Sequence, residues 1–129
     1  MLFSKICVLG LGYIGLPTAA MFASRKLSVI GVDINKSTVD TVNLGQIHIV
    51  EPGLKEVVQT AVNKGFLYAS QTPLVADAFL IAVPTPIQFP DGCDMLPQSD
   101  LSYIKAAIQS ISLVLKKGNL VVIESTSPV

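Results

Sequence analysis

The chain has 129 residues, half of them hydrophobic and only 14% charged, and nine Lys and Arg residues balance nine Asp and Glu residues. This length is that of one ordinary domain with a core of its own, and the composition excludes an intrinsically disordered chain. The charge balance leaves no basic stripe, so we expect no nucleic-acid partner.

The two cysteines, Cys7 and Cys93, do not form the pattern of a paired or metal-binding site. Cys7 lies in an apolar run and Cys93 in a polar stretch, and neither belongs to a CxxC motif. A disulfide framework and a zinc site are unsupported, and we predict no metal. Because unpaired cysteines fit a reducing compartment, we expect a cytoplasmic protein.

Residues 6–23 carry no charge and superficially resemble a signal peptide. Three glycines and Pro17 interrupt the run, which disfavours a continuous apolar helix, and a strand pattern restarts at Leu27. We interpret the run as core elements and expect no association with a membrane.

The first elements in chain order form a predicted β-α-β unit. Residues 2–9 are typical of a strand, residues 12–25 of a helix with small residues on one face, and residues 28–33 of a second strand. Together they have the size of a β-α-β unit, roughly 30 residues.

Two helices and two strands follow. Asn35 is a typical N-cap for a helix over residues 37–44, and residues 54–63 form the next predicted helix; a glycine follows each of them shortly. Residues 66–70 and 78–83 are predicted strands, apolar enough for a buried parallel sheet.

The remaining chain predicts one loop, one helix and one strand. The prolines of residues 84–98 exclude a helix and a central strand there. Ser99 or Asp100 can cap a helix over residues 103–115, and residues 120–123 form the last predicted strand.

The alternation of strands and helices predicts an α/β fold, a doubly wound parallel sheet of the Rossmann type with strand order 3-2-1-4-5. No residues are left for the sixth strand of that arrangement. We therefore expect residues 1–129 to be a dinucleotide-binding domain that is truncated before its last strand.

Three glycines, Gly10, Gly12 and Gly15, stand at G-x-G-x-x-G spacing between the first predicted strand and helix. In such a motif the first glycine allows a tight turn, the second lets a pyrophosphate approach the backbone, and the third lets the helix lie close to the sheet. The N–H groups at the helix start then receive the phosphate charge.

Asp33 ends the second predicted strand, at the place where dinucleotide-binding domains carry the acid that binds the ribose. Its charge would repel a 2′-phosphate, and no Arg follows it, so NAD is favoured over NADP. Lys36 is the one nearby cation, and we interpret it as a solvated helix residue. The alternative for Asp33 itself is an acid that only caps a helix or a strand end.

Ligands of open α/β sheets bind at the carboxyl ends of the strands, where Asp33 and residues 83–86 and 124–128 are predicted to meet. Candidate cofactor contacts there are Val83, Thr85, Ser125 and Thr126, although hydroxyls in loops are often only turn formers. For Glu124 we expect a structural or orienting role. His48 is interpreted as a packed or loop histidine rather than a general base.

Five stretches in register resemble one family: VLGLGYIGLPTAAMFA, VIGVDIN, NLGQIHIVEPGL, LIAVPTPI and VVIESTSPV. They are similar to the amino-terminal part of the nucleotide-sugar 6-dehydrogenases, which act on UDP-glucose, UDP-N-acetylmannosamine and related sugars. GQIHIVEPGL and ESTSPV resemble the UDP-N-acetylmannosamine branch.

The resemblance implies two successive NAD-dependent oxidations, which carry the sugar C6 alcohol through an aldehyde to a carboxylate, with a cysteine holding a covalent intermediate. It places cofactor contacts on Gly10, Gly12, Tyr13, Ile14, Gly15, Asp33, Thr85 and Thr126. Some relatives carry an Arg where this chain has Thr38, so a cationic contact with the adenosine is not expected here.

The resemblance also places the nucleophilic Cys and an assisting Lys of the family further downstream, so we expect no catalytic residue in this chain. We expect it to bind NAD weakly and not to complete the oxidation. For the full-length enzyme, the resemblance implies a UDP-sugar substrate, a homodimer and a place in surface polysaccharide synthesis.

Three alternatives stay open from the sequence. The substrate could be UDP-glucose or UDP-N-acetylglucosamine, or the chain could be a nucleotide-binding module without chemistry. Another Rossmann dehydrogenase, such as the 3-hydroxyacid type, is disfavoured by VPTP together with IHIVEPGL.

Overall fold

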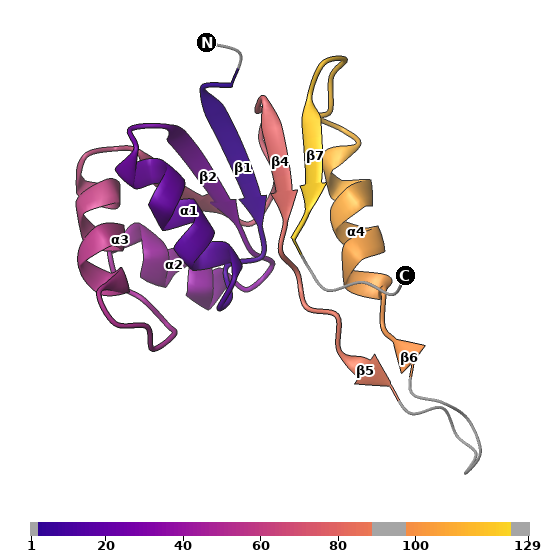
Figure 1. The fold of residues 1–129 in the computed structure, drawn as a ribbon, viewed down its shortest axis with the longest axis horizontal. Helices are drawn as coiled ribbons and strands as arrows, with labels where there is room; N and C mark the ends of the chain where they lie inside the picture. The colour runs from indigo at the N-terminus through magenta and orange to yellow at the C-terminus, as the bar shows by residue number, and fades with distance from the viewer. Residues whose placement is uncertain (1–2, 89–97, 125–129) are drawn as a thin grey trace.

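The computed structural model describes residues 3–88 and 98–124. Their main feature is a five-stranded parallel sheet in the order β3-β2-β1-β4-β7, which confirms the predicted strand order (Figure 1). The strands are β1 (Lys5–Leu9), β2 (Ser28–Val32), β3 (Leu67–Ser70), β4 (Ala78–Ile81) and β7 (Leu120–Ile123).

Four helices connect these strands: α1 (Gly15–Ser24), α2 (Lys36–Asn43), α3 (Leu54–Asn63) and α4 (Ser102–Ile111). The prediction for α3 is confirmed residue for residue. Helix α1 starts three residues later than predicted, because the glycine motif is used in a turn. Helix α4 ends four residues earlier than predicted, and the N–H groups of both Val114 and Leu115 donate to the Ile111 carbonyl oxygen beyond its end.

Of the two predicted side-chain caps, the one that starts α2 is confirmed. The Asn35 side chain accepts hydrogen bonds from the N–H groups of Ser37 and Thr38 at the start of α2. For α4 the prediction of Ser99 or Asp100 as the cap is wrong: the N-cap residue is Leu101, which makes no side-chain capping bond among the described residues, and Asp100 lies one residue before it, where its Oδ1 accepts from the Ser102 N–H at 2.9 Å.

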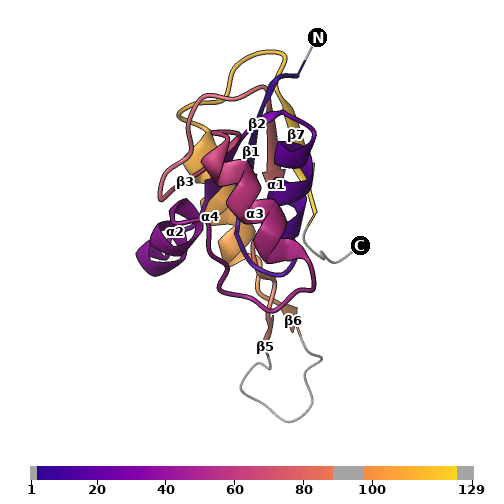
Figure 2. The ribbon, with the colours of Figure 1, turned by 90° about the vertical axis from the view of Figure 1, so that its left-hand side faces the viewer.

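The proline-rich segment holds a small antiparallel ladder that the sequence did not predict. Strands β5 (Ile87–Gln88) and β6 (Gln98–Ser99) pair there and extend away from the carboxyl edge of the main sheet (Figures 1 and 2). Prolines exclude a strand in the middle of a sheet, because they have no N–H group to donate to the neighbouring strand. This two-residue pair lies outside the main sheet, so the restriction does not apply to it.

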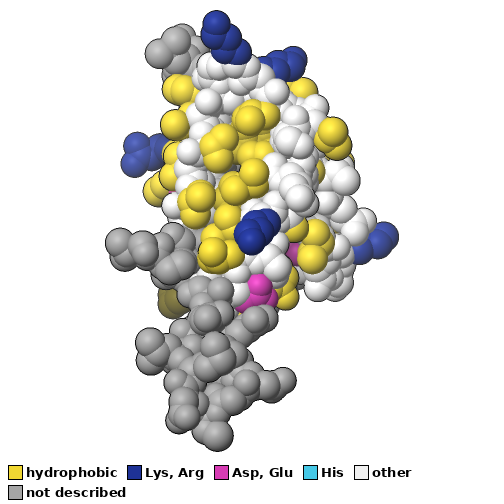
Figure 3. Space-filling view, turned by 90° about the vertical axis from the view of Figure 1, so that its right-hand side faces the viewer, with side chains coloured by type: hydrophobic (Ala, Val, Ile, Leu, Met, Phe, Trp, Pro, Cys, Tyr) yellow, Lys and Arg dark blue, Asp and Glu magenta, His cyan; other side chains and the backbone are white. Residues whose placement is uncertain are grey.

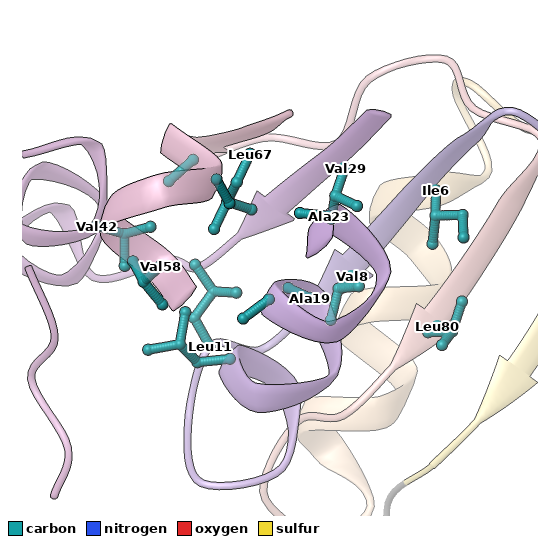
Figure 4. Packing of buried hydrophobic residues seen from close by; sticks show 14 of the residues in the cluster. Ile6, Val8, Leu11, Ala19, Ala23, Val29, Val42, Val58, Leu67 and Leu80 are labelled. Carbon is teal, nitrogen blue, oxygen red and sulfur yellow. The ribbon is translucent and has the colours of Figure 1, made fainter. Parts of the chain in front are cut away.

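Helices cover both faces of the sheet, which fits the composition of its inner strands: β2, β1 and β4 are apolar except for Lys5 and Ser28 at the strand starts. On one face, side chains of the sheet pack against α1, α2 and α3, as Figure 4 shows for Val8, Ala19, Val29 and Val58. On the other face the sheet packs against α4; the residues of this cluster include Cys7, Leu9, Phe79, Ile81, Ala107 and Ile111.

Strand β7 forms an edge of the sheet and is poorly covered. Its four side chains are 36% to 48% exposed, whereas the side chains of the neighbouring β4 are buried. Hydrophobic side chains accordingly gather on this face of the molecule (Figure 3). No helix among the described residues is long and apolar enough to cross a membrane.

Candidate cofactor-binding site

The turn between β1 and α1 requires glycine for two steric reasons. Gly10 has a φ of +96°, and a Cβ there would lie 2.6 Å from the carbonyl oxygen of Ala82. A Cβ on Gly15 would overlap the carbonyl oxygen of Gly10. The turn is therefore packed tightly against the end of β4 and against the start of α1, as the motif predicts.

Gly12 differs from these two glycines, because a Cβ there would meet nothing within 4 Å. The backbone at Gly12 consequently borders open space. Helix α1 begins just beyond it, and its N-cap residue, Ile14, makes no side-chain capping bond among the described residues. Open space beside uncapped N–H groups at a helix start is the geometry that suits a phosphate group.

Asp33 lies beside this turn and is held there by both carboxylate oxygens. Oδ2 accepts a hydrogen bond from the Leu11 N–H at 3.0 Å, and Oδ1 accepts one from the Asn35 N–H at 2.9 Å. Each oxygen keeps a second lone pair for another donor. Asp33 thus has a structural role at the end of β2, which was the alternative, and its carboxylate can still accept hydrogen bonds from ligand hydroxyls.

A cavity of about 430 Å³ opens next to Asp33, within the size range of small-molecule sites. It brings together Gly10, Asp33 and Val83, three of the predicted cofactor residues. Its other walls come from the segment after β3 and from α4; they include Gln71, Thr72, Pro73, Tyr103, Ala106 and Ser110.

The sequence reasoning missed these two walls. The position of residues 71–73 at the carboxyl end of β3 was a usable signal, since ligands of such sheets bind at that edge. The face of α4 gave no comparable signal, because a helix face that lines a cavity and one that packs in a core have similar composition.

Among the described residues, the predicted contacts Tyr13, Ile14 and Thr85 are not in the walls of this cavity. Tyr13 and Ile14 are on the surface of the glycine turn, 68% and 52% exposed. Thr85 is half-buried in the segment that leaves β4. Ser125 and Thr126 lie outside the described residues.

Glu124 follows β7 directly and is tied to two elements. Its N–H donates to the Ile81 carbonyl oxygen at 2.8 Å, which extends the ladder between β7 and β4. Its Oε2 accepts a hydrogen bond from the Thr18 hydroxyl on α1 at 3.2 Å. This agrees with the structural or orienting role that we expected for Glu124.

Lys36, the cation that follows Asp33 in the sequence, forms an ion pair with Asp40 at 2.7 Å. Both side chains are largely exposed, as expected for solvated helix residues. Thr38, at the position where some relatives have Arg, is only 8% exposed. His48 is exposed in the loop between α2 and α3.

The thiol of Cys7 is inside the sheet and fully buried. Burial raises the pKa of Cys7 from 9.0 to about 11, so the reactive thiolate is scarce near neutral pH. Cys93 lies outside the described residues. In the part of the chain that the structure describes, no three His, Cys, Asp or Glu side chains gather as metal ligands.

A second cavity, about 310 Å³, lies between the carboxyl end of α1 and the length of α3 and is lined by residues that include Lys26, Glu56 and Lys64. None of the predicted site residues lines it. We place the candidate site at the cavity beside Asp33, because the glycine turn and the ribose acid meet there.

Comparison with known proteins shows which family the chain belongs to. The UDP-N-acetyl-D-mannosamine dehydrogenase of Campylobacter jejuni is 61% identical over 127 residues, which are 98% of this chain and 30% of that protein. The NDP-N-acetyl-D-galactosaminuronic acid dehydrogenase of Ralstonia nicotianae is also 61% identical, over 98% of this chain and 29% of its own length.

A solved structure, the UDP-N-acetyl-mannosamine dehydrogenase from Staphylococcus aureus, superposes with a TM-score of 0.88 at 50% identity and covers 95% of this chain and 29% of its own. The chain thus spans about 30% of the length of the relatives that it matches. The profile of the UDP-glucose/GDP-mannose dehydrogenase family, NAD binding domain, matches residues 4–129. The chain belongs to this family, and its matched region is the NAD-binding domain.

Proposed function

We propose that this chain is the NAD-binding part of a UDP-sugar 6-dehydrogenase, with UDP-N-acetyl-D-mannosamine as the substrate of the complete protein. The observation that carries the cofactor part is the junction of the glycine turn with Asp33, made by the bond between the Leu11 N–H and the carboxylate. NAD would supply a hydride acceptor when bound; each of the two oxidations would reduce one NAD, so the complete reaction from alcohol through aldehyde to carboxylate would consume two NAD and one water.

The residues of the site fit the parts of NAD in order along the carboxyl edge of the sheet. The adenosine occupies the cavity beside Asp33, and its ribose hydroxyls donate to that carboxylate. The pyrophosphate lies over Gly12, against the N–H groups of residues 13–15. We assign the nicotinamide end to the carboxyl ends of β4 and β7, where Thr85 follows β4; the predicted contacts Ser125 and Thr126 lie outside the described residues.

The choice of NAD over NADP follows from charge. A 2′-phosphate on the adenosine ribose would meet the negative Asp33 at close range. Lys36, the nearby cation, is already paired with Asp40. We therefore infer that NADP binds more weakly than NAD.

The sugar is selected elsewhere in the complete protein. Two relatives whose names give different sugars are equally identical to this chain, which supports a domain that carries the cofactor and leaves substrate choice to other parts.

We further propose a cytoplasmic, homodimeric complete enzyme in surface polysaccharide synthesis. Cys7 is buried and largely protonated and Cys93 lies outside the described residues, so we propose from the resemblance, which places the nucleophile further downstream, that neither cysteine is the nucleophile of the reaction.

The test is calorimetric titration of the 129-residue chain with NAD and with NADP. We expect NAD to bind more tightly, and Asp33→Asn to remove most of that preference. Glu56→Gln is the matched control, since it removes one negative charge from an exposed residue of α3 that lines the other cavity. Equal affinity for the two cofactors, unchanged in Asp33→Asn, would contradict the proposal.

A further inference from the structure

Thr18 on α1 touches two segments that the proposed function assigns to different halves of the cofactor. Its hydroxyl lies 2.9 Å from the Ile14 carbonyl oxygen, in the glycine turn, and 3.2 Å from Oε2 of Glu124, at the end of β7. The contact with Glu124 joins residues 106 positions apart in the chain.

The contact with Ile14 alone would be ordinary. Ser and Thr side chains in helices often donate to the carbonyl four residues earlier, and Thr41 on α2 does so to Ser37 at 2.8 Å. The Thr18 hydroxyl has one proton to donate. A carboxylate is the stronger acceptor because it is charged, so Glu124 is what sets Thr18 apart.

The end of β7 needs such a contact more than the inner strands do. All four β7 side chains are at least 36% exposed, so burial does little to fix this strand. Apart from the ladder with β4, which continues through the Glu124 N–H, the bond to Thr18 is the hydrogen bond that ties the strand end to a helix among the described residues.

We propose that Thr18 and Glu124 form a positioning pair, which holds the carboxyl end of β7 in register with the glycine turn. The inference deepens the proposed function and rests on it for its ligand consequence. The glycine turn takes the pyrophosphate, and the end of β7 borders the nicotinamide half. Loss of the pair therefore weakens binding of the nicotinamide half and spares the adenosine half.

The first test follows the strand end itself by hydrogen exchange of the Glu124 amide. Thr18→Val and Glu124→Ala should each speed its exchange about fivefold, the effect of losing one typical hydrogen bond. Thr18→Ser keeps the donor and should stay near wild type, whereas Glu124→Gln replaces the charged acceptor by a neutral one and should lie between wild type and Glu124→Ala. Thr41→Val removes an equivalent intrahelical bond without a strand contact, and serves as the control.

The second test compares NAD with ADP, which lacks the nicotinamide half. In Thr18→Val the Kd for NAD should rise about fivefold while the Kd for ADP stays within about twofold of wild type. If the exchange rate of the Glu124 amide is unchanged in Thr18→Val and Glu124→Ala, the proposed pair does not hold the strand end. If the ratio of the Kd for NAD to the Kd for ADP is unchanged in Thr18→Val, the pair has no role in the site. If the wild-type chain binds neither ligand, the proposed function fails, and the exchange experiment alone still decides whether the pair exists.

Discussion

The backbone N–H of Leu11 donates a 3.0 Å hydrogen bond to Oδ2 of Asp33. Leu11 lies inside the glycine turn and is fully buried, and Asp33 directly follows the end of β2. The parallel register of β1 and β2, with Leu9 beside Val32, brings the two residues together. One carboxylate thus shapes the phosphate turn and also faces the cavity for the nucleoside.

Because Asp33 also holds the glycine turn, we expect Asp33→Ala to destabilise the fold. The substitution leaves the buried Leu11 N–H without its acceptor, which should lower the free energy of unfolding by about 1 to 3 kcal/mol. Urea denaturation measures the loss. Asp33→Asn keeps one side-chain oxygen and should lose less, so equal stability of Asp33→Ala and wild type would contradict the prediction.

Two alanine substitutions in the glycine turn should have opposite outcomes. Gly15→Ala places a methyl group against the Gly10 carbonyl oxygen. We expect it to destabilise the fold by about 3 kcal/mol or more, because the backbone at Gly10 and at Gly15 would have to move apart. Gly12→Ala meets no atom within 4 Å and should unfold at nearly the wild-type urea concentration.

Titration with NAD completes this comparison. Since Gly12 borders the open space proposed for the pyrophosphate, Gly12→Ala should bind NAD more weakly in spite of its normal stability. Tight NAD binding by Gly12→Ala would show that the phosphate lies elsewhere.

The buried thiol of Cys7 should be inert in the folded chain. In a Cys93→Ser background, a thiol reagent at about pH 8 should label Cys7 only as fast as the chain unfolds, because the thiol is buried and its pKa is raised to about 11. Denaturant should make labelling immediate. Rapid labelling of the native chain would contradict this environment for Cys7.

The same thiol predicts a pH dependence of stability at alkaline pH. Its pKa is raised from 9.0 in the unfolded chain to about 11 in the fold, so between these values the unfolded chain holds fewer protons and stability falls as pH rises. Urea denaturation as a function of pH measures the fall. The difference in slope between wild type and Cys7→Ala isolates the contribution of this thiol.

At the other end of the sheet, Asp77 predicts a pH dependence in acid. Its Oδ2 accepts from the N–H groups of Lys5 and Ser4, both at 2.9 Å, and from the Ser4 hydroxyl, which ties the starts of β1 and β4 together. These bonds lower the pKa of Asp77 below 3.8, with the Lys5 N–H as the largest cause.

The stability that Asp77 contributes is therefore present above the unfolded pKa, and is lost as pH falls through the lower folded value. Asp77→Asn should flatten the fall of stability below about pH 4 in denaturation experiments. Asp40→Asn, at an exposed ion pair on α2, is the control. A variant with the same acid slope as wild type would contradict the assignment.

Much of the fold and part of the site could be predicted from local pattern. The strand order followed from alternating strands and helices, because right-handed crossovers permit few arrangements of such a chain. Gly10, Gly15 and Asp33 were recognisable because each position favours one residue type. Gly10 has a positive φ, Gly15 lies against a backbone carbonyl, and Asp33 supplies a hydrogen-bond acceptor at a strand end. The cap by Asn35 is of the same kind.

What only the tertiary structure decided depends on contacts between distant residues. Helix α1 starts at Gly15 because the preceding residues are held in the turn by Val32 and Ala82, and no local pattern encodes that. The wall that α4 gives to the cavity depends on how the helix packs over β4. The bond between Thr18 and Glu124 required the register of three adjacent strands, which the sequence determines only through the complete fold.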